Sequence, residues 1–227
     1  MHAWAMDVVP QSDQSVVIDR LEKHGVIQVV ELGSLDQASP LLEALSLGGL
    51  PAAEITLRTA AGLPAIAAAR RTHPNALIGA GTVRSVDDAQ QAIDQGAQFI
   101  VSPGISPEVL ELSRSLGVPA FPGVCTPTEV QAALRAGAAL VKFFPAEAIG
   151  GVAFLRALAG PFPDVRFVPT GGISASNLRN YLELPTVVAC GGTWLARPPV
   201  LAARRWDEIE ELARQASGIV AAVRQGA

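Results

Sequence analysis

The stretch ALIGAGTVRSVDDAQQAIDQG, residues 76–96, contains one complete unit of the pattern that decides the fold. It begins with a short apolar run that is typical of a buried parallel strand, and turn residues follow this run. The remainder has helical spacing, opens on Ser85 and closes on Gly96, and both residue types favour helix ends. The stretch therefore predicts a strand followed by a helix.

The same unit recurs along the chain, and its strand-like runs start at intervals of roughly 20 to 28 residues. Eight such runs are present, at 26–32, 52–57, 76–82, 97–102, 118–123, 139–144, 165–170 and 186–192. Helical patterns between them include 36–49, 85–96, 106–117, 126–137 and 174–184. Eight units predict an α/β fold of the (β/α)8 TIM-barrel class, and a doubly wound open sheet is the alternative.

The 227 residues contain no polar, low-complexity segment that would separate two halves. We therefore expect a single domain over residues 1–227. Its parts are an N-terminal helix at about 14–24 that closes the barrel bottom, a barrel at about 26–200 and a C-terminal helix at about 203–225.

Composition limits the partners that the protein can have. The net charge of −4 offers no basic footprint for nucleic acid or an anionic membrane surface. No apolar run approaches about 18 residues, and the N-terminus lacks a secretory pattern, so we expect a cytoplasmic protein. The cysteines, Cys125 and Cys190, indicate small buried residues rather than a disulfide.

Charged residues occur within one predicted strand, AEITLRT, where period-two alternation places Glu54, Thr56 and Arg58 on one face. Helices or side-chain layers cover both faces of a parallel barrel, so a charge is costly on either. An ion pair between Glu54 and Arg58 that fills the barrel is one interpretation. A reactive site is the other, because active sites of barrels lie at the C-terminal ends of the strands.

A lysine stands inside the apolar run ALVKFF, where Lys142 shares a face with Leu140 and Phe144. Desolvation and a nearby cation such as Arg58 disfavour the charged form of an amine, and a free amine attacks carbonyl carbon to form a Schiff base. A snorkelling lysine or an ion-pair partner of Glu54 is the structural alternative. The combination of Lys, Glu and Arg favours the reactive interpretation.

Two glycine loops indicate an anionic ligand. PTGGIS (169–174) follows the seventh strand and CGGTWLA (190–196) follows the eighth, and in many barrels these two loops hold phosphate through backbone amides. The histidines, His2, His24 and His73, form no cluster with metal-ligand spacing, and no nucleotide-binding motif is present. We therefore expect neither a metal nor a cofactor.

Over roughly residues 15–215, the chain resembles the 2-keto-3-deoxy-6-phosphogluconate (KDPG) aldolases, which are also known to act on 4-hydroxy-2-oxoglutarate. The resemblance rests on EITLRT, IGAGTV, VSPGIS, GVCTPTE, KFFPAE, GPFPDVRFVPTGGIS and GGTWL, in that order. It implies a homotrimeric class I aldolase of the Entner–Doudoroff pathway. Such an enzyme cleaves a phosphorylated keto-deoxy sugar acid to pyruvate and glyceraldehyde 3-phosphate.

The resemblance also implies roles for individual residues. Lys142 corresponds to the Schiff-base lysine, Glu54 to the general acid/base and Arg58 to the residue that grips the pyruvyl carboxylate. Thr82 would help to bind pyruvate, and Thr170 would influence stereochemistry. The expected substrate-binding set is Arg58, Thr82, Pro103, Phe144, Thr170, Gly171, Gly172, Gly191, Gly192 and Thr193, with phosphate on the glycine loops and Thr193.

Three positions depart from the family pattern: Gln28 where many relatives have proline, Cys125 where serine or alanine is usual, and Thr193 in place of serine. Thr193 keeps a hydroxyl for phosphate, whereas the sequence assigns no role to Gln28 or Cys125. Two alternatives stay open. One is a related pyruvate aldolase that acts mainly on 4-hydroxy-2-oxoglutarate or on the galactonate epimer, and the other is a non-catalytic barrel that binds phosphosugars.

Overall fold

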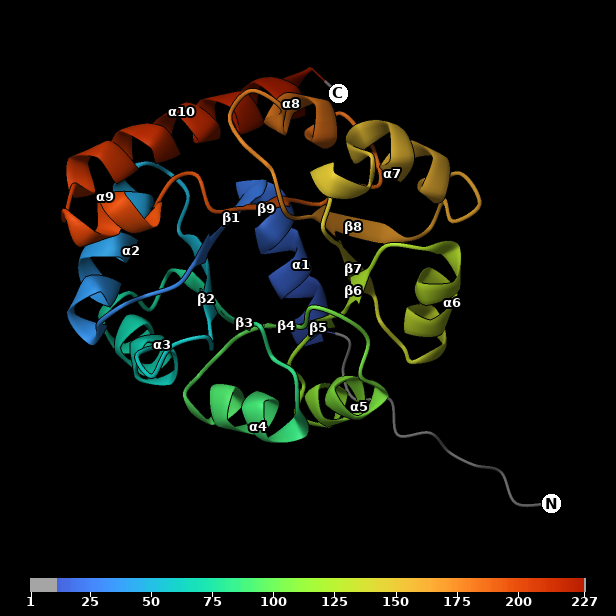
Figure 1. The fold of residues 1–227 in the computed structure, drawn as a ribbon, viewed down its shortest axis with the longest axis horizontal. Coiled ribbons are helices and arrows are strands. Elements are labelled where there is room, and N and C mark those ends of the chain that lie inside the picture. The colour runs from blue at the N-terminus through green and yellow to red at the C-terminus, as the bar shows by residue number, and fades with distance from the viewer. Residues whose placement is uncertain (1–11, 227) are drawn as a thin grey trace.

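A computed structural model describes residues 12–226 and shows a ring of strands surrounded by helices (Figure 1). The strands are β1 (Val26–Val30), β2 (Ala52–Thr56), β3 (Leu77–Gly81), β4 (Ile100–Val101), β5 (Ala120–Phe121), β6 (Gly123–Val124), β7 (Leu140–Phe143), β8 (Arg166–Pro169) and β9 (Cys190–Gly192). The helices are α1 (Ser12–His24), α2 (Ala38–Leu47), α3 (Gly62–Thr72), α4 (Val86–Asp94), α5 (Pro107–Ser115), α6 (Pro127–Arg135), α7 (Gly151–Ala159), α8 (Leu178–Leu182), α9 (Pro198–Ala202) and α10 (Trp206–Gln225). Two short 3-10 helices are η1 (Leu35–Gln37) and η2 (Glu147–Ile149).

The strands pair in parallel in the orders β5-β4-β3-β2-β1-β9 and β6-β7-β8. The fifth predicted run joins the two sheets, because it pairs with β4 through β5 and with β7 through β6, on either side of Pro122. Two isolated bridges, Phe167 with Val187 and Thr170 with Gly191, join β8 to the last run. The predicted (β/α)8 barrel is therefore confirmed, and the open-sheet alternative is wrong.

Apolar side chains from the strands and from α1 form a buried cluster in the barrel. In the view of Figure 1, α1 overlaps the centre of the ring of strands. Its side chains at 17, 18 and 21 belong to a buried cluster that the strands complete. The cluster consists of Val17, Ile18, Leu21, Ile27, Ala52, Leu77, Phe99, Val101, Phe121, Leu140, Val168, Val188 and Ala189. A second and larger apolar layer lies between the strands and the outer helices.

Side-chain caps begin several of the predicted helices. Ser85 accepts a hydrogen bond from the backbone N–H of Asp88 at 3.1 Å, and Ser106 and Thr126 act in the same way on α5 and α6. These caps satisfy N–H groups that the first helical turn leaves free. The terminal helices differ slightly from expectation, since α1 begins at Ser12 and α10 begins at Trp206.

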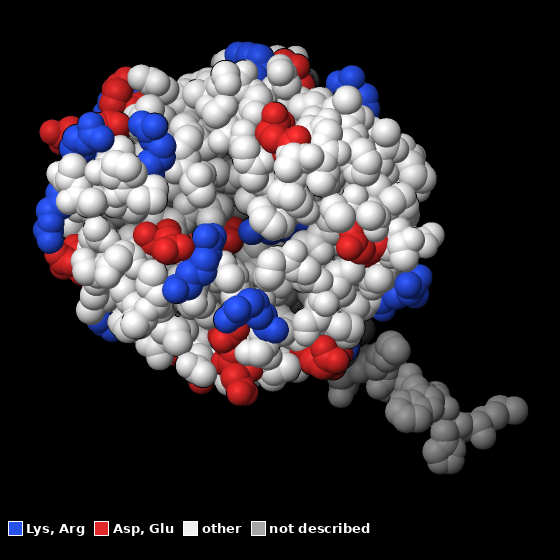
Figure 2. Space-filling model, in the orientation of Figure 1, with Lys and Arg blue, Asp and Glu red and all other residues white. Residues whose placement is uncertain are grey.

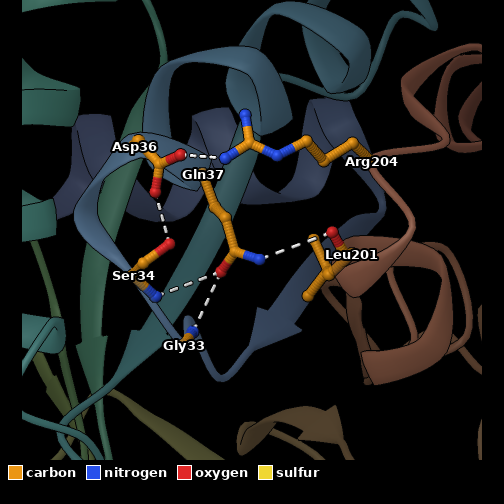
Figure 3. A network of polar contacts seen from close by, with 6 residues as sticks. All are labelled: Gly33, Ser34, Asp36, Gln37, Leu201 and Arg204. Carbon is orange, nitrogen blue, oxygen red and sulfur yellow. Dashed lines mark hydrogen bonds and ion pairs between the residues drawn. The ribbon is translucent and has the colours of Figure 1, made fainter.

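Polar contacts tie the loop after β1 to the segment after β9 (Figure 3). The side-chain oxygen of Gln37 accepts a hydrogen bond from the backbone N–H of Gly33 at 2.9 Å, and its amide nitrogen donates to the carbonyl of Leu201 at 3.4 Å. Beside them, Arg204 forms an ion pair with Asp36. These contacts link the first and the last unit of the barrel, so they support its closure.

Residues 1–11 and 227 lie outside the described part of the chain, and His2 is among them. Within residues 12–226, no helix is long and apolar enough to cross a membrane. Cys125 and Cys190 are both free thiols. Burial raises the pKa of the Cys190 thiol, which therefore stays protonated.

We predict that Gly79→Ala lowers the free energy of unfolding by about 1–3 kcal/mol, because overpacking a filled core is costly. A Cβ at this position would lie 2.2 Å from Cε2 of the buried Phe99 ring. Urea unfolding followed by circular dichroism measures the change.

Gly218→Ala is the matched control, because nothing lies within 4 Å of its added Cβ in α10. This variant should gain about 0.5–1 kcal/mol from the higher helix propensity of alanine. Equal unfolding midpoints for the two variants would show that the barrel interior has room beside Phe99.

Candidate active site

A pocket of about 130 Å³ opens at the C-terminal ends of the barrel strands. The space-filling view shows a hollow near the centre of the molecule, with basic and acidic side chains around it (Figure 2). The pocket is lined by Val29, Arg58, Thr82, Pro103, Lys142, Phe144, Thr170, Gly171, Gly172, Gly191, Gly192 and Thr193. These residues come from strands far apart in sequence, which the barrel brings to one end.

Lys142 and Glu54 form a buried ion pair beneath this pocket. Nζ of Lys142, on β7, lies 3.2 Å from Oε1 of Glu54, on β2, and the two side chains are 9% and 3% exposed. The Phe144 ring covers the ammonium, with its centroid 5.3 Å from Nζ. Of the two partners, only Lys142 reaches the pocket surface, because Glu54 is not among the lining residues.

Gly81 provides the space that Glu54 occupies. A Cβ at position 81 would lie 2.2 Å from Oε1 of Glu54, so any other residue would displace the carboxylate. The neighbouring residue, Thr82, has a left-handed backbone with φ of 59°. A positive φ is uncommon for a residue that is not glycine, and here it occurs where β3 ends and the pocket begins.

Arg58 lies at the rim of the pocket and not in the barrel interior, which corrects our expectation. Strand β2 ends at Thr56, and the Arg58 side chain is 51% exposed. Its Nη1 lies 3.3 Å from Oε2 of Glu31, and its Nε donates to Oγ1 of Thr82 at 3.2 Å. The partner of Glu54 is Lys142, so the alternative of a Glu54–Arg58 pair filling the barrel is wrong.

The loop Thr170–Gly172 and the end of β9 also line the pocket; Cys190–Gly192 form this strand, which corrects the expectation that they belong to a loop after it. Gly171 and Gly172 have φ values of +99° and +81°, a conformation that side chains rarely adopt. Gly191 is needed for space, because a Cβ there would lie 2.4 Å from Oγ1 of Thr170. Thr193 follows directly and is exposed at the rim. Three glycines and two threonines that line the pocket are therefore brought together here, and the Thr170 hydroxyl donates to the carbonyl of Val168 at 3.4 Å.

The two unassigned positions are explained only in part. The Cys125 thiol donates to the carboxylate of Glu129 at 3.2 Å, and this bond, together with burial, raises the pKa of the thiol. The amide nitrogen of Gln28 donates to the carbonyl of Val29 at 2.8 Å, whereas its buried oxygen has no partner among the described residues. Nothing in the structure connects Gln28 with the pocket chemistry.

The structure brings all the predicted site residues to the pocket or directly beneath it. Sequence reasoning missed Val29, Glu31 and Gly81. A strand valine carries no signal of its own, and Glu31 could have been noticed as a charge at the end of the first strand. Among the described residues, no group of three or more His, Cys, Asp or Glu side chains is arranged to hold a metal ion.

A family described as "Aldolase: KDPG and KHG aldolase" matches residues 17–212. The chain belongs to this family. One relative, the 2-dehydro-3-deoxy-phosphogluconate aldolase of Treponema pallidum, is 46% identical over 204 residues, which cover 90% of this chain and 97% of the relative.

Solved structures of the family have the same fold. A KDPG aldolase from Legionella pneumophila, with pyruvate captured as a covalent carbinolamine intermediate, is 38% identical with a TM-score of 0.83 and covers 87% of this chain and 96% of that one. The KDPG aldolase of Zymomonas mobilis ZM4 with 3-phosphoglycerate is 37% identical with a TM-score of 0.81 and covers 89% and 95%.

We predict that Lys142→Met lowers the free energy of unfolding by about 3–5 kcal/mol at pH 7, because it leaves the carboxylate of Glu54 buried without a partner. Adding Glu54→Leu should recover most of this loss, since apolar residues can replace a buried ion pair. A double-mutant cycle in urea measures the coupling. If the loss in the double variant equals the sum of the two single losses, the charges do not interact.

Proposed function

We propose that this protein is a class I aldolase that cleaves KDPG to pyruvate and glyceraldehyde 3-phosphate. We propose that it also cleaves 4-hydroxy-2-oxoglutarate to pyruvate and glyoxylate. The observation that carries the proposal is the 3.2 Å contact between Nζ of Lys142 and Oε1 of Glu54 under a pocket with anion-binding features at its rim. Family membership and the names of the relatives support it.

The reaction starts at Lys142. Its neutral amine attacks the C2 carbonyl of the keto acid, and loss of water gives a protonated Schiff base. Glu54 lies within hydrogen-bonding distance of Nζ, so it can take the proton that the amine must lose. The low exposure of both groups limits competition from solvent water.

Cleavage uses the Schiff base as an electron sink. The C3–C4 bond breaks, its electron pair moves toward the iminium nitrogen, and the C4 hydroxyl loses its proton as the aldehyde forms. Glu54 can accept this proton directly or through one water. The enamine that remains is protonated at C3, and hydrolysis of the imine then releases pyruvate and restores Lys142.

The rim residues orient the two anionic ends of the substrate. Arg58 can offer parallel N–H donors to the pyruvyl carboxylate, a geometry that lysine cannot reproduce. On the other side, the amides of Gly171 and Gly172 and the hydroxyl of Thr193 can bind the phosphate. Thr82 contacts Arg58, Thr170 precedes the glycines of the loop, and Pro103 and Phe144 also line the pocket.

The resemblance to the family also supports a homotrimer in the cytoplasm, which is part of our proposal. Light scattering on the purified protein tests the assembly state. A phosphosugar-binding barrel without catalytic activity is the competing function, and covalent trapping separates it from an aldolase.

We predict that pyruvate with borohydride adds one 1-carboxyethyl group to Lys142, because reduction converts the imine on the nucleophilic amine into a stable secondary amine. Peptide mass spectrometry locates the modification. Lys142→Ala should abolish both trapping and turnover. Lys23 is the only other lysine, so modification there, or an untrapped but active enzyme, would contradict the Schiff-base assignment.

We predict that Thr193→Val lowers kcat/KM for the phosphorylated substrate by about tenfold or more, because it removes a hydrogen bond to a charged group. Thr193→Ser, which keeps the hydroxyl, is the control and should match the parent. Trapping of plain pyruvate should be unchanged in both variants. A loss of pyruvate trapping in Thr193→Val equal to its loss of cleavage would move Thr193 out of the phosphate site.

A further inference from the structure

A polar pair, the buried Tyr181 and the solvent-exposed Glu147, lies behind the loop Thr170–Gly172 and takes no part in the pocket lining. Tyr181, on α8, is fully buried at 0% exposure, and its hydroxyl donates a hydrogen bond to Oε1 of Glu147 in η2. Gly151, with φ of +60°, leaves room for this pair, because a Cβ there would lie 2.9 Å from Oε1 of Glu147 and 3.3 Å from the Tyr181 hydroxyl.

Glu147 connects this pair to the glycine loop. The backbone N–H of Glu147 donates to the carbonyl of Gly171 at 3.0 Å, and the N–H of Ala146 donates to the carbonyl of Thr170 at 2.8 Å. A Cβ at Gly172 would lie 2.6 Å from both Cβ and Cγ of Glu147. The Glu147 side chain therefore packs directly against the loop and points on toward Tyr181.

A second contact holds the far side of the loop. The side-chain amide of Asn177 donates to the carbonyl of Gly172 at 3.0 Å, and its oxygen accepts from the backbone N–H of Ser174 at 2.8 Å. Burial raises the pKa of the Tyr181 hydroxyl, and the hydrogen bond to Glu147 raises it further. The phenol thus remains a donor over the whole range in which an enzyme of this kind is assayed.

We propose that Glu147 and Tyr181 are positioning residues, which hold the loop Thr170–Gly172 in the conformation that presents its amides to a phosphate. This inference rests on the proposed function. Two consecutive glycines have large conformational freedom, and ordering them during binding would lower affinity. Contacts that order the loop beforehand avoid this loss, so the pair acts on phosphate affinity without touching the substrate.

The test compares Tyr181→Phe with the parent on two substrates. Phenylalanine keeps the buried ring and removes only the donor. KM for phosphorylated KDPG should rise about three- to tenfold, the effect of one lost hydrogen bond, whereas kcat should stay within about twofold. KM for unphosphorylated 4-hydroxy-2-oxoglutarate should be unchanged. The inhibition constant of inorganic phosphate, used as a competitive inhibitor, should rise by the same factor as KM for KDPG.

Three further variants separate positioning from general damage. Glu147→Gln keeps an oxygen that accepts from Tyr181 and should bind KDPG at least as well as the parent, whereas Glu147→Ala should behave like Tyr181→Phe. Ser113→Ala is the matched control. It also removes a fully buried hydroxyl, on α5, one with no hydrogen-bond partner among the described residues. Its KM values should equal those of the parent.

The inference would be overturned if Tyr181→Phe had the same KM for KDPG as the parent. It would also be overturned if KM rose equally for both substrates. The same holds if Glu147→Gln loses as much affinity as Glu147→Ala. If the parent itself cleaves neither substrate, the proposed function fails, which is a different result from an active parent with an unaffected Tyr181→Phe variant.

Discussion

The contact between the ammonium of Lys142 and the carboxylate of Glu54 is the constraint on which the rest of the barrel mouth depends. Two charges that water barely reaches are costly unless they are paired at close range. The parallel register of the strands brings them together from β7 and β2. Gly81 leaves room for the carboxylate, and Phe144 shields the ammonium on the pocket side. The ion pair thus explains why glycine occupies position 81 and why an aromatic ring occupies position 144.

This arrangement separates the chemistry from recognition. The reacting groups lie on regular strands, where hydrogen bonds to both neighbours limit their movement. The groups proposed to hold the substrate lie on loops beyond the strand ends, where Arg58 contacts Glu31 and Thr82. The loop Thr170–Gly172 is held by contacts with Ala146, Glu147 and Asn177, none of which lines the pocket. Selectivity for a phosphate can therefore change without disturbing the Lys142–Glu54 pair.

The repeat along the sequence was sufficient to predict the barrel, because each βα unit carries its own alternation and capping residues. The sequence pattern also located Lys142 and Glu54, because a charged residue is unusual in a strand that is buried on both faces. It failed for Arg58 because alternation does not say where a strand stops, and it did not foresee that Pro122 divides the fifth strand. Contacts such as Tyr181 with Glu147 join distant segments and have no local pattern.

In the proposed mechanism, Lys142 forms the covalent bond while Glu54 moves the protons. Exchange of the methyl protons of pyruvate in D2O, followed by NMR, tests this most directly, because exchange requires both the imine and a base. We expect the parent to exchange these protons. Glu54→Gln should still form the borohydride-trapped adduct on Lys142 but exchange about 10²–10⁴-fold more slowly. Exchange within about twofold of the parent would show that Glu54 only balances the charge of the lysine.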